Sequence, residues 1–367
     1  MKSDNKIYVW EYIEEYKKNK RNILNIVDNV FNSGQLILGK QVRKFENNFS
    51  RYVDCKYGVG VNSGTDALLI ALMAVGVKKY DEVVTVSNTA VPTVSAIVSS
   101  GAIPVYVDID DRDFLLDTTK LEQSITKKTK AIIAVNLYGQ SCNYDKINKI
   151  AKKYNIKVIE DCAQSAGAMY KNKPSGSMGD LSAFSFYPTK NLGGYGDGGM
   201  VITNNKKLYN RCLMLRKYGM KKTYYSELHG INSRLDEVQA AILNFKLKKL
   251  NEFVKKRRNI ANIYNQCLKN TELILPNENK HNYHSYYVYV VRHKKRKKIL
   301  DYLSKNKIFC NISYPYPIHS MKGYRHLTKK NNLRNTNLLA KEIFSLPMYP
   351  ELSLEKVDKV IKILKQF

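Results

Sequence analysis

Hydrophobic and polar positions follow two alternating periods from about residue 57 onward. Short runs of β-branched and other apolar residues alternate with stretches in which apolar residues recur at every third or fourth position. This succession is typical of βαβ units and predicts a mainly parallel, buried sheet. The predicted strands are Tyr57–Val61, Glu82–Ser87, Ile103–Val107, Ala131–Asn136, Lys157–Glu160, Ala183–Phe186 and Met200–Thr203. The predicted helices between them include Thr65–Val75, Val91–Ser100, Tyr144–Tyr154 and Lys206–Lys217.

The pattern changes after about residue 245. A long helix rich in Lys and Asn is followed by an apolar run at Ser285–Val291, a helix, a second run at Ile308–Ser313 and two final helices. We therefore expect an α/β protein with a large domain over residues 1–245 and a smaller α+β domain over residues 246–367. The helix predicted from Arg234 to Leu268 is the expected hinge between them.

Composition supports a folded protein with a large core. The chain has 367 residues, of which 44% are hydrophobic and 25% charged, and this excludes disordered, collagen-like and coiled-coil classes. The net charge is 61 − 32 = +29, which raises nucleic acid or an anionic membrane as partners. The basic residues are scattered through the chain, so we interpret them as a solvated surface coat. A polyanionic substrate such as a nucleotide stays open.

Cysteine spacing and hydropathy predict a cytoplasmic protein without a metal or a membrane segment. The six cysteines lie far apart, with no CxxC pair and no zinc-ligand spacing, so we expect no structural metal and reduced thiols. No apolar signal-like region follows Met1. The longest apolar run, Ala67–Val77, is shorter than the roughly 20 residues that a membrane-spanning helix needs.

The first motif with candidate chemistry is Asn62-Ser-Gly-Thr-Asp66, where a predicted strand meets a predicted helix. Free N–H groups and the positive end of the helix dipole favour an anion there. Gly64 permits close backbone approach and Thr65 adds a hydroxyl. The same residues also make an ordinary helix N-cap, so both interpretations stand on the local sequence.

Asp161 follows an apolar strand, in Glu160-Asp-Cys-Ala-Gln164. The carboxyl ends of parallel strands form the edge at which open α/β sheets bind ligands. A carboxylate at that edge is suited to hold a cationic ring nitrogen. Capping of the next turn by Asp161 is the alternative interpretation.

Lys190 follows another predicted strand, with Ser185 before it and the glycine-rich stretch Gly193–Gly199 after it. A lysine at the edge of a buried sheet is suited to form a Schiff base, because burial favours the neutral amine that attacks a carbonyl. The glycines lead into a strand and not a helix, which argues against a dinucleotide fingerprint. A solvated lysine is the alternative.

A fourth motif, Gly230-Ile-Asn232-Ser-Arg234, opens an amphipathic helix. Asn232 and Ser233 are common capping residues. The functional alternative is that Asn232 donates a hydrogen bond to a phosphate.

Taken in order, these segments resemble the nucleotide-sugar aminotransferases of the DegT/DnrJ/EryC1/StrS type, which depend on pyridoxal 5′-phosphate and share the aspartate aminotransferase fold (fold type I). The resemblance covers nearly the whole chain. The segments that carry it are Gly34 to Glu46, Asn62 to Ala67, Gly101 to Asp108, Leu137 to Gln140, Glu160 to Gln164, Phe184 to Leu192, Asn232 to Glu237 and Ser345 to Pro350.

The resemblance implies a role for each motif. Lys190 would form the Schiff base with the cofactor and move the proton between the substrate carbon and C4′. Asp161 would pair with the pyridinium nitrogen, and Gln164 would bond the ring hydroxyl. The residues implied for the cofactor phosphate are Gly64, Thr65, Ser185 and Asn232, the last from a neighbouring subunit, so the protein would be a homodimer with a shared active site. Related sugar dehydratases carry His in place of this lysine, which disfavours dehydration.

The segment Thr89-Ala-Val91-Pro-Thr93 departs from the commonest pattern of the family. Many relatives place an aromatic residue near Val91 to stack on the cofactor ring, whereas Val91 would give contact without stacking. The segment is similar to that of enzymes that aminate C3 of dTDP-3-oxo-6-deoxyhexoses. Amination of C4 of a nucleotide-linked 4-keto-6-deoxy sugar stays open, and so does a plain core role for Val91.

Four further residues fall in segments that line the nucleotide-sugar site in the family. They are Tyr187, Lys217, Tyr314 and His319. Lys217 would add a cation near the diphosphate, while His319 is equally compatible with a surface role.

We therefore expect a cytoplasmic transaminase that transfers an amino group from L-glutamate to a dTDP-linked keto sugar, in the biosynthesis of amino sugars for surface polysaccharide or other glycans. A regulatory protein that holds nucleic acid is the competing class. No helix-turn-helix and no basic strand studded with aromatic residues is evident in the sequence, so we expect neither nucleic acid nor membrane as a partner.

Overall fold

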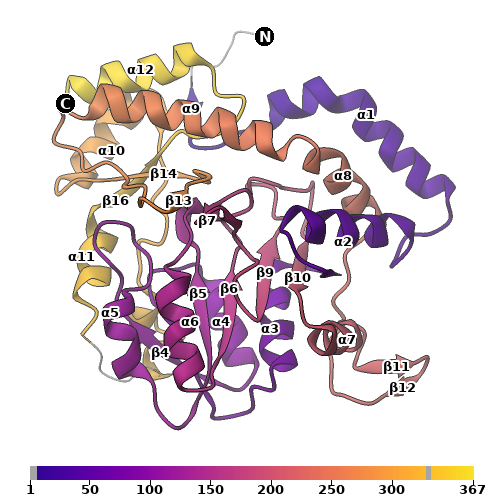
Figure 1. Cartoon of the computed structure of the whole chain (residues 1–367). Helices are drawn as coiled ribbons and strands as arrows, with labels where there is room; N and C mark the ends of the chain where they lie inside the picture. The colour runs from indigo at the N-terminus through magenta and orange to yellow at the C-terminus, as the bar shows by residue number, and fades with distance from the viewer. Residues whose placement is uncertain (1–5, 328–331) are drawn as a thin grey trace.

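The computed structural model describes residues 6–327 and 332–367, and a seven-stranded sheet lies at its centre (Figure 1). In spatial order the strands are β2 (Tyr57–Val61), β10 (Gly199–Thr203), β9 (Leu181–Ser185), β6 (Lys157–Asp161), β5 (Thr129–Val135), β3 (Glu82–Val86) and β4 (Ile103–Val107). Only β10 runs antiparallel to its neighbours; the other pairings are parallel. The predicted class, an α/β fold with a mainly parallel mixed sheet, is confirmed.

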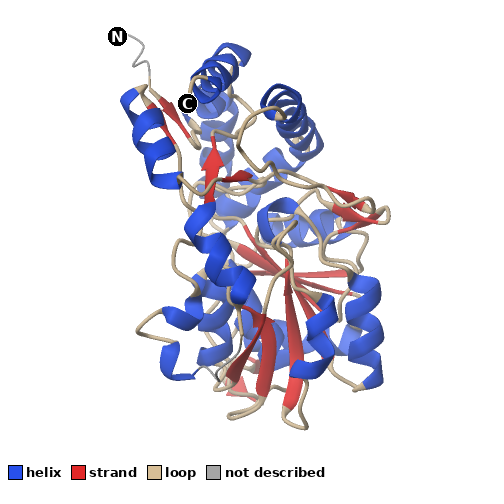
Figure 2. Ribbon diagram, turned by 90° about the vertical axis from the view of Figure 1, so that its left-hand side faces the viewer, coloured by secondary structure: helices blue, strands red, loops and turns tan. Residues whose placement is uncertain are grey.

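The strands are apolar on both faces because helices cover both sides of the sheet (Figure 2). All five residues of β3 and all five of β10 are buried. The covering helices are α3 (Gly64–Ala74), α4 (Val91–Ser99), α6 (Tyr144–Lys153) and α7 (Lys206–Leu215). They agree with the predicted helices to within one or two residues.

Two long helices precede the sheet, α1 (Ile13–Asn32) and α2 (Lys40–Tyr52). α2 packs its buried Phe45 and Phe49 against Phe184 and Phe186. Its N-terminal amides, at Gln41 and Val42, donate to the buried carboxylate of Glu237. This carboxylate lies at the start of α8 (Glu237–Leu247), so α2 and α8 are joined by a hydrogen-bonded cap as well as by apolar packing.

The remaining elements form a second apolar cluster. They are α9 (Leu250–Leu268), β14 (Tyr289–Arg292), α10 (Arg296–Lys305), β15 (Ile308–Phe309), β16 (Ile343–Leu346) and α12 (Leu354–Lys365). The helix α11 (Arg334–Glu342) instead buries Leu339 in the apolar cluster of the central sheet. Ile7 of β1 (Ile7–Tyr8) belongs to this cluster, and β1 pairs in parallel with β15. The first described strand therefore lies against the last third of the chain.

The single helix predicted from Arg234 to Leu268 is wrong: α8 ends at Leu247 and α9 begins at Leu250. No glycine or proline marks this interruption. The flanking lysines are engaged by α1, since Lys246 is buried in an ion pair with Glu15 and Lys249 Nζ donates to Asn19 Oδ1 over 2.7 Å. Tertiary contacts thus accompany a break that local propensity does not predict.

Short elements complete the chain. They are α5 (Thr118–Leu121), β7 (Met169–Tyr170), β8 (Lys173–Pro174), β11 (Met220–Lys222), β12 (Tyr225–Ser226) and β13 (Asn282–Tyr283). The hairpin of β11 and β12 projects from the body of the molecule (Figure 1). All six cysteines are free thiols. Among the helices of the described residues, none has the length and apolar character required to cross a bilayer.

Candidate active site

A cavity of about 290 Å³ opens at the carboxyl edge of the parallel strands. It brings together seven of the residues singled out by sequence: Gly64, Thr65, Asp161, Gln164, Ser185, Tyr187 and Lys190. They come from the ends of β6 and β9 and from the start of α3. Because carboxyl ends of parallel strands share one edge of a sheet, residues far apart in sequence meet here.

The N-terminus of α3 forms one end of the cavity. Ser63 caps the helix, its hydroxyl accepting a hydrogen bond from the Asp66 amide over 3.1 Å. A Cβ on Gly64 would lie 2.7 Å from the Cβ of Ser185, so only glycine lets the helix start approach this serine. The first-turn amides have no acceptor within the helix. With the hydroxyls of Thr65 and Ser185, they make a cradle suited to a phosphate.

Asp161, the last residue of β6, forms another wall. Its Oδ2 accepts a hydrogen bond from Thr93 Oγ1 over 2.8 Å, and its Oδ1 accepts one from the Ala163 amide over 3.1 Å. Thr93 Oγ1 is in turn 2.9 Å from Thr89 Oγ1. Burial raises the pKa of Asp161, while the Thr93 and Ala163 hydrogen bonds and the charge of Lys190 oppose that rise. A cation beside this carboxylate would further offset the cost of burying its negative charge.

Gln164 is oriented from two sides. Its Oε1 accepts the amide hydrogen of Tyr138 over 2.8 Å, and its Nε2 donates to the hydroxyl of Tyr314. The rings of Tyr138 and Tyr314 stack with centroids 6.3 Å apart. One Nε2 hydrogen of Gln164 is left to face the cavity. Tyr314 thus contacts a residue of the cavity wall without lining the cavity itself.

Lys190 reaches the cavity from a turn that follows β9. Its amide donates to Tyr187 O over 2.9 Å. A Cβ on Gly193 would lie 2.3 Å from Pro188 O, so the glycine-rich stretch permits this tight turn. The Lys190 Nζ lies 4.6 Å from the centroid of the Tyr287 ring. The amine and the carboxylate of Asp161 border the same cavity.

Val91 does not line the cavity. Its side chain is 38% exposed, whereas its neighbours Ala90 and Pro92 do line the cavity. The reason is its position as the first residue of α4, where the helix turns successive side chains to different faces. Small, non-aromatic residues therefore border this side of the cavity.

His319 also lies outside the lining of the cavity. Its ring Nδ1 is 2.7 Å from Ser87 Oγ, and its backbone amide donates to the same hydroxyl. Burial lowers the pKa of this histidine. His319 fastens its loop to the segment between β3 and α4, two residues from Thr89.

Asn232 and Lys217 face each other across an antiparallel bridge and do not line this cavity. The neighbouring Ser233 is fully buried; its hydroxyl donates to Asp66 Oδ2 over 2.7 Å and accepts from the Asn62 amide. Asn232 is therefore held close to the start of α3.

Sequence reasoning missed three residues of the site: Thr93, Tyr138 and Tyr287. Thr93 stands in the Thr89–Thr93 segment that the sequence analysis singled out, so the segment was an available signal although this residue was given no role. Tyr138 has a φ of 60° and is followed by Gly139 with a φ of 108°. No local pattern marks Tyr287, which approaches Lys190 only in the folded chain.

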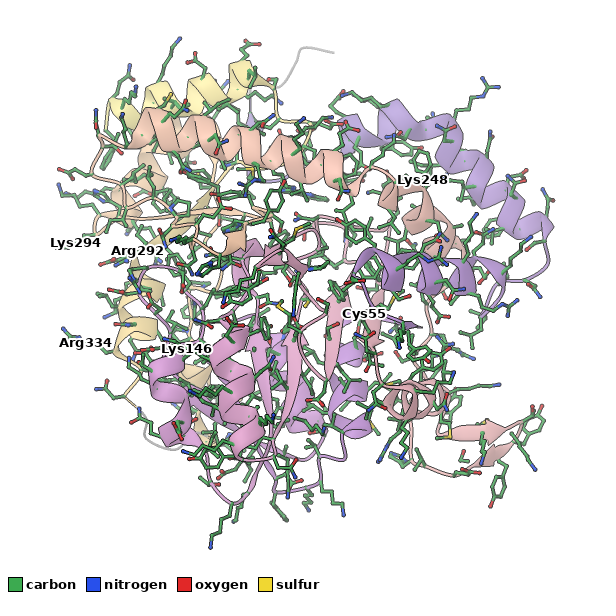
Figure 3. The ribbon with its side chains drawn as sticks, viewed as in Figure 1. Cys55, Lys146, Lys248, Arg292, Lys294 and Arg334 are labelled. Atoms are coloured by element: carbon green, nitrogen blue, oxygen red, sulfur yellow. The ribbon has the colours of Figure 1, made fainter. Side chains whose placement is uncertain are left out.

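Basic side chains come from many elements and do not gather on one. Lys146 lies on α6, Lys248 lies between α8 and α9, and Lys294 follows β14 (Figure 3). This distribution agrees with a general surface coat.

The fold and this cavity define a transaminase of fold type I, and comparison with known proteins agrees. The model of the DegT/DnrJ/EryC1/StrS aminotransferase family matches residues 17–365. The chain belongs to this family.

The chain is 47% identical over 366 residues to dTDP-3-amino-3,4,6-trideoxy-alpha-D-glucose transaminase of Micromonospora megalomicea, with 98% of each chain covered. It is 42% identical to dTDP-3-amino-3,6-dideoxy-alpha-D-galactopyranose transaminase of Aneurinibacillus thermoaerophilus, covering 95% of this chain and 96% of the relative. A pleiotropic regulatory protein of Geobacillus stearothermophilus is 40% identical, with 96% of each chain covered.

Solved structures agree with this membership. The structure of DesV from S. venezuelae in complex with a ketimine intermediate superimposes with a TM-score of 0.96, at 32% identity over 98% of each chain. The structure of NtdA from Bacillus subtilis, with bound cofactor PMP, gives a TM-score of 0.89 at 30% identity, covering 95% of this chain and 82% of that one. The DegT family aminotransferases depend on pyridoxal phosphate.

Proposed function

We propose that the protein transfers an amino group from L-glutamate to a dTDP-linked 3-oxo-6-deoxyhexose, giving the 3-amino sugar for a surface polysaccharide or other glycan. The observation that carries this proposal is the common cavity of Lys190, the buried carboxylate of Asp161 and the open amides at the start of α3. An amine, an acid and an anion cradle are the groups that this reaction requires.

The donor set fits pyridoxal 5′-phosphate. The cradle of Gly64, Thr65 and Ser185 suits the phosphate, the Asp161 carboxylate suits a protonated ring nitrogen, and the free Nε2 hydrogen of Gln164 suits the ring oxygen. The close approach of Gly64 to Ser185, which any Cβ would block, supports this assignment. When bound, the cofactor supplies an electron sink for the substrate carbanion.

The residues of the chain supply binding and proton transfer. Lys190 would take the proton from the substrate carbon that bears nitrogen and deliver it to C4′ of the cofactor, and would reverse this transfer with the second substrate. The hydrogen bonds that Asp161 accepts from Thr93 and Ala163 favour its anionic form against the effect of burial, and the anion would favour a charged ring nitrogen. Gln164, oriented by Tyr138 and Tyr314, would donate its remaining Nε2 hydrogen to the ring oxygen of the cofactor.

We also propose a homodimer with a shared active site. Asn232 does not line the cavity of its own chain, yet an amide at a phosphate cradle is chemically apt. Large apolar residues are exposed: Leu36 at 53% and Ile37 at 47% in the segment between α1 and α2, and Tyr187 at 51% at the cavity. An exposed apolar surface of this kind is suited to a subunit interface. Within each subunit we retain residues 1–245 and 246–367 as two domains, with the β1 segment packed on the second.

Two relatives support C3 as the carbon that is aminated, because both carry 3-amino-dTDP-sugar names. Tyr187 at the cavity, and Lys217 contributed by the second subunit, are the proposed contacts of the sugar nucleotide. Tyr314 and His319 are proposed as substrate-site residues that act through Gln164 and through the segment around Thr89.

The deciding experiment combines spectroscopy with product analysis. The purified protein is titrated with L-glutamate and then with a dTDP-3-oxo-6-deoxyhexose, and we expect glutamate to bleach the visible cofactor band and the keto sugar to restore it. NMR of the product identifies the aminated carbon. Restoration by a 4-keto sugar alone would make the protein a C4 enzyme.

Absence of any cofactor band, together with DNA binding that weakens steeply with salt, would favour the regulatory class. No bleaching by glutamate, with a band present, would overturn glutamate as donor.

A further inference from the structure

We infer that Tyr287 is a positioning residue for Lys190: the face of its ring holds the lysine amine whenever that amine is not joined to the cofactor. This inference rests on the proposed function for its purpose, but its geometry is independent of it. The Lys190 Nζ lies 4.6 Å from the ring centroid, within the roughly 6 Å at which a cation is attracted to an aromatic face.

The ring, and not the nearby acid, takes the amine. Both oxygens of Asp161 accept hydrogen bonds from other groups, Thr93 and the Ala163 amide. Asp161 attracts Lys190 electrostatically, and both residues border the same cavity. The ammonium is therefore drawn toward the cavity by the Asp161 carboxylate, while its closest described partner is the aromatic face of Tyr287.

Tyr287 is itself fixed at both ends. Its hydroxyl is 3.0 Å from Thr189 Oγ1, on the residue before the lysine. Its carbonyl accepts a hydrogen bond over 3.0 Å from Nη1 of Arg257, which is fully buried and also bonds Met348 O. A Cβ on Gly139 would lie 2.9 Å from the Tyr287 amide, so the backbone is confined there as well. A ring held this firmly defines one location for the amine.

The position of Tyr287 also divides two cavities. Tyr287, Thr189 and Tyr314 line a second cavity of about 260 Å³, which also contains Trp10. Lys190 and Gln164 line the first. Lys190 thus lines the cavity that contains Asp161, while its amine lies over the ring of Tyr287, which lines the second cavity.

Such a platform meets a specific need. In each half-reaction the amine must leave its covalent partner and later return to the same atom. A free, flexible lysine loses time and entropy in that search, whereas one held at a fixed point close by is already oriented.

The first test uses the full-length, cofactor-free protein without substrate. Lys190 is acetylated by brief pulses of acetic anhydride and its modification rate is read by peptide mass spectrometry. We expect Y287F, which keeps the ring face, to react at about the wild-type rate. We expect Y287L to react about 2- to 25-fold faster, because the ammonium has lost its aromatic partner.

Leucine also opens space beside the lysine, so a series of fluorinated phenylalanines at position 287 separates the two causes. Fluorine withdraws electron density from the ring face and barely alters its shape. Labelling that quickens with each added fluorine supports the inference, and a flat series overturns it. This series also covers the case in which Y287L does not fold.

A matched control is Y283L. The Tyr283 ring carries the Arg258 guanidinium at 4.0 Å, on a tyrosine that does not line either cavity. We expect Y283L to leave Lys190 labelling unchanged; an equal gain in Y283L and Y287L would overturn the inference.

In the loaded enzyme, Y287L is expected to slow the return of Lys190 after keto-sugar addition more than its displacement by glutamate. If the protein proves inactive toward every keto sugar, the proposed function is wrong. The labelling experiment, which uses no substrate, still decides whether Tyr287 holds the Lys190 amine.

Discussion

The hydroxyl of Thr93 donates a hydrogen bond to the Asp161 carboxylate over 2.8 Å, and both groups are buried. The hydroxyl favours the charged form of an acid whose pKa burial raises. Thr93 lies in α4, and Asp161 is the last residue of β6, so the two are distant in sequence and meet only in the folded chain.

Removal of that hydroxyl is expected to weaken cofactor binding. In T93V, Asp161 becomes harder to ionise and pairs less well with the ring nitrogen. A hydrogen bond to a charged group contributes about 1.5–3 kcal/mol, so we expect about a 10- to 100-fold loss of affinity for pyridoxal phosphate. Fluorescence titration of the cofactor-free protein measures it, and T93S serves as the control that retains the hydroxyl. Equal affinities for T93V and wild type would refute this role.

The cofactor-free protein should lose stability as pH rises, in part through Asp161. Its folded-state pKa is raised above the ordinary value, so its contribution to stability is fully present below the unfolded pKa and is lost as pH rises through the folded pKa. D161N lacks this ionisation. Its melting temperature relative to wild type should therefore be higher at pH 8 than near the ordinary carboxyl pKa of about 4, as scanning calorimetry would show. A difference that is constant across this range would contradict the assignment of the pH dependence to Asp161.

Replacement of Lys190 by alanine is expected to abolish turnover and leave the fold intact, because no other amine in the described residues lines this cavity. Loss of an essential proton carrier and nucleophile removes at least about 10²–10⁴-fold of the rate. Stopped-flow absorbance with L-glutamate measures the rate, and circular dichroism checks the fold. Turnover near the wild-type value would overturn the proposed mechanism.

Enlargement of Gly64 should disturb the phosphate cradle. The Cβ of G64A would meet the Ser185 Cβ at 2.7 Å, and the helix start must then move away. We expect weaker cofactor binding with little change in the core. G323A is the matched control, since nothing lies within 4 Å of a Cβ at Gly323. The affinities of the two variants for pyridoxal phosphate are compared by equilibrium titration; similar values would contradict the cradle.

Mixed dimers test the shared site. K190A and N232A subunits are each expected to be impaired, but a K190A/N232A heterodimer has one site with both residues intact if Asn232 serves the partner. Random mixing of a symmetric dimer should then restore about a quarter of the wild-type activity. No recovery on mixing would mean that Asn232 acts within its own subunit or not at all.

The central sheet was predictable because each strand is a short apolar run bounded by turn residues. β2 and β4 match the predicted bounds, and β6 ends at Asp161, one residue beyond its prediction. β1 has only two residues and owes its existence to β15, so no local pattern announces it. The interruption between α8 and α9 was not predicted for a related reason: the contacts of Lys246 and Lys249 with α1 form only in the folded chain.

At the site, sequence identified the residues whose chemistry is tied to a strand end or a helix start, such as Asp161, Lys190 and Gly64. It did not identify Thr93 and Tyr287, whose importance depends on what they touch. Sequence reasoning located the right segment around Val91 but named the wrong residue, since Ala90 and Pro92 line the cavity and Val91 does not.

The pairing of Ile7 with Ile308 has a consequence for synthesis of the chain. A ribosome that adds about 5–20 residues per second delivers β15 on the order of 15–60 s after β1. The central sheet can form during this interval, whereas Ile7 has no strand to join. The β1 segment of the nascent chain therefore stays unpaired, with Ile7 exposed, until β15 has been synthesised. Its pairing with β15 is then among the last steps of folding.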